Sequence, residues 1–199
     1  MPEVSPVLAQ QLSVKFFAHD PESVELAGFI PIFHRWIQES RLPDRLLIDV
    51  ADYRHVADGP GVVLIAHEAH YALDREHGPL GLECTRRRDQ PGPLEEKLVG
   101  GFRDALAACR HLEEDPARPI RFRTDRARVA IVSRRYASAG DEAWEAARPA
   151  LEAFAARLYP GLPVRLQRST DPRAPFAVEL EAPGAPGVAA LLDRLAEAA

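Results

Sequence analysis

Cysteine is scarce in this 199-residue sequence, in which Cys84 and Cys109 are the only two. Two cysteines cannot supply a thiolate metal cluster or a framework of several disulfides. Long apolar runs are also missing, since none approaches the roughly 18 residues that a membrane span needs. The N-terminal segment has no basic stretch followed by an apolar one, so we expect no secretion signal, no membrane partner and a cytoplasmic location.

The overall composition is that of a soluble globular protein. Hydrophobic residues make up 46% of the chain and charged residues 28%, and the net charge is −5. Lysine is nearly absent, because only Lys15 and Lys97 stand among the 25 basic residues. This length and composition predict one compact domain over 1–199 with a substantial core.

The first half of the sequence predicts four strands and two helices. Apolar residues recur at helical spacing after Asp20 and Pro21, which indicates a helix that is broken or restarts near Pro31. A second helix begins at Pro93, and its apolar stripe consists of Leu94, Leu98, Phe102, Ala105, Leu106, Cys109 and Leu112. The strands are predicted in "LSVKFFAHD", "RLLIDVADY", "VVLIAHEAHYALD" and "LGLECTRRR".

The second half predicts four more strands and two helices. Phe122 alternates on even positions whereas Val129 and Ile131 alternate on odd ones, so two strands should meet at a turn or bulge near Asp125. The other strands are predicted in "VRLQRS" and "FAVELEAP", and the helices over 141–159, with an interruption at Pro149, and over 188–198.

Both halves repeat the order of strand, interrupted helix, further strands and helix. We therefore predict an α+β fold with a mainly antiparallel sheet and helices packed on it. The repeated order indicates a tandem duplication of ferredoxin-like units, with repeats at 12–115 and 119–199. A single irregular antiparallel sheet without symmetry is the alternative.

The stretch from Asp49 to Tyr71 gathers three of the seven histidines and several acids. His67 continues the apolar series of Val63 and Ile65, so we predict that it is mostly buried and hydrogen-bonded to the neighbouring strand. Asp49 lies on that strand, and a His67–Asp49 pair could serve as a catalytic base and its orienting partner. The other candidates, assigned to binding, are Asp52, His55, Glu68, His70 and Tyr71.

Two further interpretations of this stretch stay open. Glu68 and His70 at alternate strand positions could bind a metal ion together with an acid from the adjacent strand, although no metal can be specified. The plain alternative is a strand with one core face and one solvated face. Arginines crowd residues 118–135, but the acidic total charge and the lack of stacking aromatics argue against a nucleic-acid partner.

No nucleophile elbow, phosphate loop or cofactor signature is present. The first hypothesis is therefore a non-enzymatic module that binds a small ligand or assembles with a protein partner, with amphipathic elements suited to a homodimer. The alternative is an enzyme or metal-binding protein whose site lies on the strands spanning 46–74. The sequence names no cofactor.

The segments "FIPIFHRWIQ", "LLIDVADYRHV", "GPGVVLIAHEAHYALD" and "GLECTRRRD" resemble an uncharacterised family of short bacterial proteins. The resemblance covers the first half of the chain well and the second half loosely. It implies that residues 49–74 form the signature region of the family. It carries no activity and assigns no catalytic or binding residue.

Overall fold

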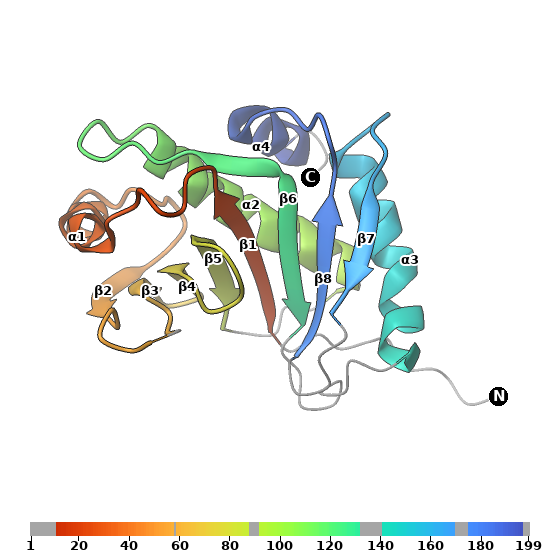
Figure 1. The fold of residues 1–199 in the computed structure, drawn as a ribbon, viewed down its shortest axis with the longest axis horizontal. Coiled ribbons are helices and arrows are strands. Elements are labelled where there is room, and N and C mark those ends of the chain that lie inside the picture. The colour runs from red at the N-terminus through yellow and green to blue at the C-terminus, as the bar shows by residue number, and fades with distance from the viewer. Residues whose placement is uncertain (1–10, 58, 88–91, 132–140, 170–174, 197–199) are drawn as a thin grey trace.

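The computed structural model describes residues 11–57, 59–87, 92–131, 141–169 and 175–196. Eight strands form one sheet in the order β2-β3-β4-β5-β1-β6-β8-β7, and each neighbouring pair is antiparallel (Figure 1). Helices pack on this sheet, so the predicted α+β class is confirmed. The strands are β1 Leu12–Ala18, β2 Leu47–Asp52, β3 Val62–Ala66, β4 Ala69–Asp74, β5 Gly81–Arg86, β6 Phe122–Ile131, β7 Arg165–Arg168 and β8 Phe176–Glu181. The helices are η1 Leu26–Phe29, α1 Ile30–Glu39, α2 Leu94–Glu113, α3 Asp141–Leu158 and α4 Val188–Ala196.

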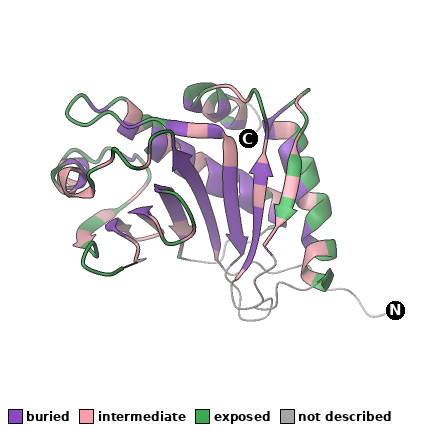
Figure 2. Cartoon of the chain, in the orientation of Figure 1, coloured by how far each residue is buried: buried purple, intermediate pink, exposed green. Residues whose placement is uncertain are grey.

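The two halves of the chain meet at the centre of the sheet. In each half the first strand pairs with the last, β1 with β5 and β6 with β8, and β1 also pairs with β6. The strands therefore form one continuous sheet with β2 and β7 at its edges, which are more exposed than the central strands (Figure 2). The tandem duplication stays a prediction.

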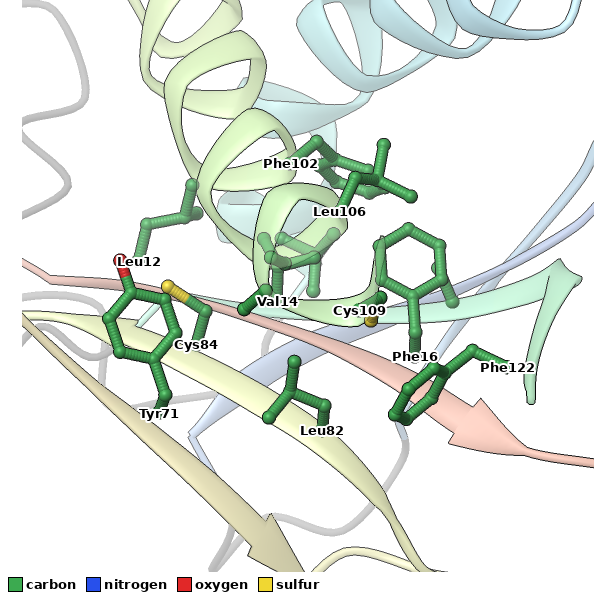
Figure 3. Packing of buried hydrophobic residues seen from close by; sticks show 14 of the residues in the cluster. Leu12, Val14, Phe16, Tyr71, Leu82, Cys84, Phe102, Leu106, Cys109 and Phe122 are labelled. Carbon is green, nitrogen blue, oxygen red and sulfur yellow. The ribbon is translucent and has the colours of Figure 1, made fainter. Parts of the chain in front are cut away.

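The core lies between one face of the sheet and α2, which crosses behind β1 in Figure 1. Every residue of the predicted apolar stripe is buried. Phe102 of α2 meets Phe16 of β1 edge to face with 5.6 Å between ring centroids, and Figure 3 shows both within the cluster. Each fully buried Leu or Phe contributes about 1.5–3 kcal/mol relative to its exposed state, so this face fixes α2 on the sheet.

Two predictions about prolines are corrected. The helix expected at Pro21 begins only at Leu26, as the 3-10 helix η1, and α1 follows with Pro31 in its first turn. Proline is tolerated there because its missing amide hydrogen has no helical acceptor. Helix α3 runs without interruption through Pro149, where we expected a break.

The single strand expected in "VVLIAHEAHYALD" is wrong. Its residues form the hairpin of β3 and β4, with His67 and Glu68 in the turn between them. The parity of the core residues changes across this turn, from Leu64 on β3 to Tyr71 and Leu73 on β4. Val63 and Ile65 are also apolar, and they concealed this parity change in the sequence.

Near Asp125 the predicted irregularity is confirmed, but the predicted pair of strands is not. Strand β6 is continuous, and its register against β1 shifts between Phe16, which pairs with Ala127, and Ala18, which pairs with Phe122. The extra residues of β6 bend the strand without ending it. The second of these two strands was expected in "ARVAIVSRRY", and its part beyond 131 lies outside the described residues, as do the last residues of the closing helix.

Candidate functional site

The face of the sheet opposite α2 carries charged side chains. Within the described part of the chain no helix packs on it, and we call it the helix-free face. Directly paired residues form a row across it: Glu83 of β5 pairs with Lys15 of β1, Lys15 with Arg128 of β6, and Arg128 with Glu179 of β8. We call these four residues the charged row.

Burial makes this row unusual. Lys15 is 0% exposed, and Glu83 and Arg128 are each 7% exposed. Asp74 and Ser13, on the same face, are each 2% exposed. Charged side chains are almost never buried to this degree unless they are paired, so each one is expected to have an oppositely charged or hydrogen-bonding partner.

Lys15 is held by Asp74 of β4. The Lys15 Nζ lies 2.5 Å from the Asp74 Oδ1 and 3.3 Å from the Asp74 backbone carbonyl oxygen. The ammonium also lies 5.7 Å from the centre of the Phe17 ring, which supplies a cation–π contact. Lys15 therefore turns toward Asp74, away from the Glu83 that it pairs with in the register.

Glu83 has one satisfied and one unsatisfied oxygen. The Ser13 hydroxyl donates to Oε1. The Oε2 atom is buried and accepts no hydrogen bond, and the His77 Nδ1, also buried, lies 3.6 Å from it, at ion-pair distance when the imidazole is protonated. These two atoms define a gap in the hydrogen bonding of an otherwise paired cluster.

The two acids of the cluster titrate far apart. Burial raises the pKa of Asp74 to about 6, against the opposing charge of Lys15, and the nearby charge of Glu83 raises it further. Burial also opposes the ionisation of Glu83, but His77, Ser13 and Lys15 together outweigh it and lower the pKa of Glu83 to about 2. At neutral pH Glu83 therefore holds a permanent negative charge, and the pair takes up its first proton near pH 6.

A cavity of about 330 Å³ opens beside this cluster, and we call it the β4 cavity. Its apolar wall consists of Pro60, Val63, Ile65 and Ala72, and Tyr53 also lines it. The polar lining consists of His70, Asp74, Glu76, Glu83 and Thr85. An apolar wall with a few convergent polar groups is typical of a small-molecule site.

Of the residues predicted from the sequence, His70 alone lines the β4 cavity. Its Nε2 is buried without a hydrogen-bond partner, and burial, with a smaller effect of Arg87, lowers the pKa of its imidazole. The ring is therefore neutral at physiological pH. Asp49 shares this face, because it pairs with Ile65 and Ile65 pairs with His70, but it is exposed and accepts a hydrogen bond from the amide of Val50 at 2.8 Å.

The predicted His67–Asp49 pair is not formed. His67 is partly buried, as the prediction requires, but it lies in the β3–β4 turn, so the predicted strand position is wrong. Its backbone amide donates to the carbonyl of Leu46 at 2.9 Å, and within the described part of the chain its imidazole makes no hydrogen bond. A turn position removes His67 from the strand alternation on which the prediction rested.

The remaining candidates are dispersed. Glu68 lies in the same turn as His67, and Asp52 and His55 are exposed, with Asp52 forming an ion pair with Arg54 at 2.7 Å. Tyr71 points into the core on the opposite face of the sheet, beside Cys84 in Figure 3, and burial raises the pKa of its hydroxyl. Among the described residues no hydrogen bond or ion pair joins two members of the predicted set.

Sequence reasoning missed Lys15 and Glu83, and it noted Arg128 only as one of the arginines of 118–135. The available signal was positional: Lys15 stands between Val14 and Phe16 in an almost wholly apolar strand, and Glu83 stands between Leu82 and Cys84. A charged residue inside such a strand has either a solvated or a paired environment, and sequence alone does not distinguish the two.

Comparisons with known proteins give no relative, because no protein-family model, curated protein or solved structure matches the chain. The resemblance to a bacterial family stays a prediction. None of the described helices is long and apolar enough to cross a membrane. Nor do the described residues bring together three or more His, Cys, Asp or Glu side chains that could hold a metal ion.

Proposed function

We propose that the chain is a non-enzymatic small-ligand-binding protein whose site is the β4 cavity. The ligand would carry a cationic or N–H donor group on an apolar body. The observation that supports this most directly is Glu83, a lining residue of the cavity, whose buried Oε2 accepts no hydrogen bond.

A ligand donor at this position has a clear energetic reason to bind. A buried acceptor without a partner costs about 1–3 kcal/mol, and more when it is charged, and an N–H group in the cavity would recover that energy. Glu83 supplies the fixed negative charge because its pKa is about 2. Val63, Ile65 and the Tyr53 ring would contact the apolar part of the ligand, and His70 Nε2 offers a second polar contact.

The test uses benzamidine and benzylamine as cationic probes and benzyl alcohol as a neutral probe of similar size. Isothermal titration calorimetry at pH 7.5 should detect the cations and not the alcohol. Glu83→Gln should weaken binding about tenfold or more, because it replaces a charged acceptor by a neutral one. Glu22→Gln, at an exposed carboxylate, is the matched control and should bind as the parent does.

Equal binding of the three probes, or unchanged binding by Glu83→Gln, would exclude the β4 cavity as a site for cations. The variant keeps the shape of the side chain and an acceptor for Ser13, so we expect it to fold. Circular dichroism of each variant checks that its secondary structure is intact.

Self-association is a second proposal, carried by a different feature. Edge strand β2 and its flanks present large exposed apolar side chains, with Leu46 63% and Ile48 52% exposed. An exposed apolar edge strand is suited to pair with a second copy of itself. Light scattering over a range of protein concentrations should show a dimer that Ile48→Lys disrupts, and a monomer at all concentrations would refute this proposal.

A further inference from the structure

Arg128 is a buried cation at the centre of the sheet. It lies on β6 between Lys15 of β1 and Glu179 of β8 in the register, and it is 7% exposed. Arginine does not lose its proton in proteins, so this charge is permanent. A buried permanent charge requires a counter-charge, because desolvating an unpaired ion is among the most costly arrangements in a folded chain.

The neighbouring acidic side chains are paired with other cations. Glu179, directly opposite Arg128, accepts two hydrogen bonds from Arg126, with its Oε2 3.0 Å from Nε and 2.7 Å from Nη2. Asp74 is held by Lys15. Within the described residues the Arg128 guanidinium makes no hydrogen bond and no ion pair with any carboxylate.

A second cavity, of about 460 Å³, is lined by Arg128, and we call it the β6 cavity. Its polar lining on the helix-free face includes Arg126, Arg128, Gln167, Glu179 and Glu181. The Arg126 and Glu179 charges cancel as a pair, and Glu181 lies 4.0 Å from Arg165. Arg168, which also lines the cavity, pairs with Asp141 at 2.6 Å. Among the described residues, the positive charge of Arg128 is therefore left without a counter-charge.

We propose that the β6 cavity is an anion site, separate from the β4 cavity, in which Arg128 binds the carboxylate of a small organic acid. The planar guanidinium matches a carboxylate with two parallel hydrogen bonds. A singly charged carboxylate balances the one unpaired cation. A doubly charged phosphate would bring a second negative charge next to Glu179 and Glu181, and the repulsion between like charges disfavours its binding. Gln167 at the rim can donate to the same ligand.

The experiment follows the Nε–H resonance of Arg128 in ¹⁵N-labelled protein. Acetate, butyrate and benzoate are the carboxylate probes, inorganic phosphate is the competing anion, and sodium chloride matches the ionic strength. At least one carboxylate should shift this resonance saturably, and phosphate should bind more weakly than that carboxylate. The measurement uses the parent protein, so it does not depend on the folding of any variant.

Arg128→Met and the matched control Arg121→Met, at an arginine whose side chain is 70% exposed, complete the test. Arg128→Met should weaken carboxylate binding about tenfold or more, because it removes the charge-assisted hydrogen bonds, whereas Arg121→Met should not. Without ligand, Arg128→Met should melt at or above the parent, since it removes an unpaired buried charge.

Three results would overturn the proposal: no carboxylate moves the Arg128 resonance, Arg128→Met binds like the parent, or phosphate binds more tightly than every carboxylate. A melting temperature of Arg128→Met well below the parent would also refute it, by showing that the charge is already neutralised within the chain. The β6 cavity and the β4 cavity share no lining residue. Failure of benzamidine to bind the β4 cavity would therefore not affect the test of carboxylate binding at Arg128.

Discussion

Lys15→Met is the most direct perturbation of the charged row. The substitution keeps a long unbranched side chain in the central strand β1 and removes the one cation that, among the described residues, pairs with Asp74. Asp74 is 2% exposed, so water cannot take the place of the lost ammonium. Breaking a buried ion pair by removing one partner typically costs about 3–5 kcal/mol, and we expect a loss of this size at pH 8.

The loss should depend on pH. The pKa of Asp74 is already raised to about 6, and removing Lys15 raises it further, because the Lys15 charge lowers it. An acid whose pKa is higher in the folded state contributes most to stability below its unfolded pKa, and this contribution is lost as pH rises through the folded pKa. At pH 5 the Asp74 of the variant is protonated and neutral, so the loss should be smaller by about 1–3 kcal/mol, the equivalent of one to two pKa units.

Urea unfolding at pH 5 and pH 8, followed by circular dichroism, measures both values. Arg54→Met is the control, because it breaks the Asp52–Arg54 pair, in which both side chains are 40% exposed. An exposed pair contributes about 0–1 kcal/mol, so this control should change little at either pH. A loss below about 1 kcal/mol for Lys15→Met at pH 8, or an equal loss at both pH values, would refute the assignment of a buried pair.

Three other predictions follow from single contacts. The carboxyl carbon of Asp74 should titrate by NMR with a midpoint near pH 6, since burial raises its pKa, and a midpoint near 4 would contradict this. Gly61→Ala should lower the melting temperature strongly, because φ is +64° and an added Cβ would stand 2.2 Å from a β4 carbonyl oxygen, whereas Gly187→Ala, with nothing within 4 Å, should be near neutral. His111 stands 5.7 Å from the Trp36 ring, and burial, with the charge of Arg41, lowers its pKa from 6.5. In a variant without the other tryptophan, the fluorescence of Trp36 should therefore titrate below pH 6.5, and stability should fall as pH drops through this range.

Sequence periodicity predicts most of the fold because the core face of each element is apolar at regular spacing. The stripe of α2 is the clearest case, since it repeats over the whole helix with charged residues between its members. Strand β1 is recognisable for the same reason. The β3–β4 hairpin was missed because Val63 and Ile65 are apolar on the helix-free face as well, so the alternation that marks a turn is hidden.

The candidate site was less predictable than the fold. A strand pattern gives the face of a residue but not its cross-strand partner, which depends on register and on strands far apart in the chain. His70 was identified because it lies in the histidine-rich stretch. The pairing of Lys15 with Arg128 was not, because the two residues lie 113 positions apart in the sequence and become neighbours only when β1 pairs with β6.

The central position of β1 also constrains how the chain folds. Ser13 pairs with Thr85 on one side and with Ala130 on the other, so β1 precedes both of its partner strands by a long stretch of chain. During synthesis this largely apolar strand has no strand partner until β5, and later β6, has been synthesised. Contacts of such high sequence separation slow folding and prolong the exposure of aggregation-prone surface. Lys15 places a charge in the middle of this unpaired strand, where it opposes aggregation with another chain until Asp74 has been synthesised and can pair with it.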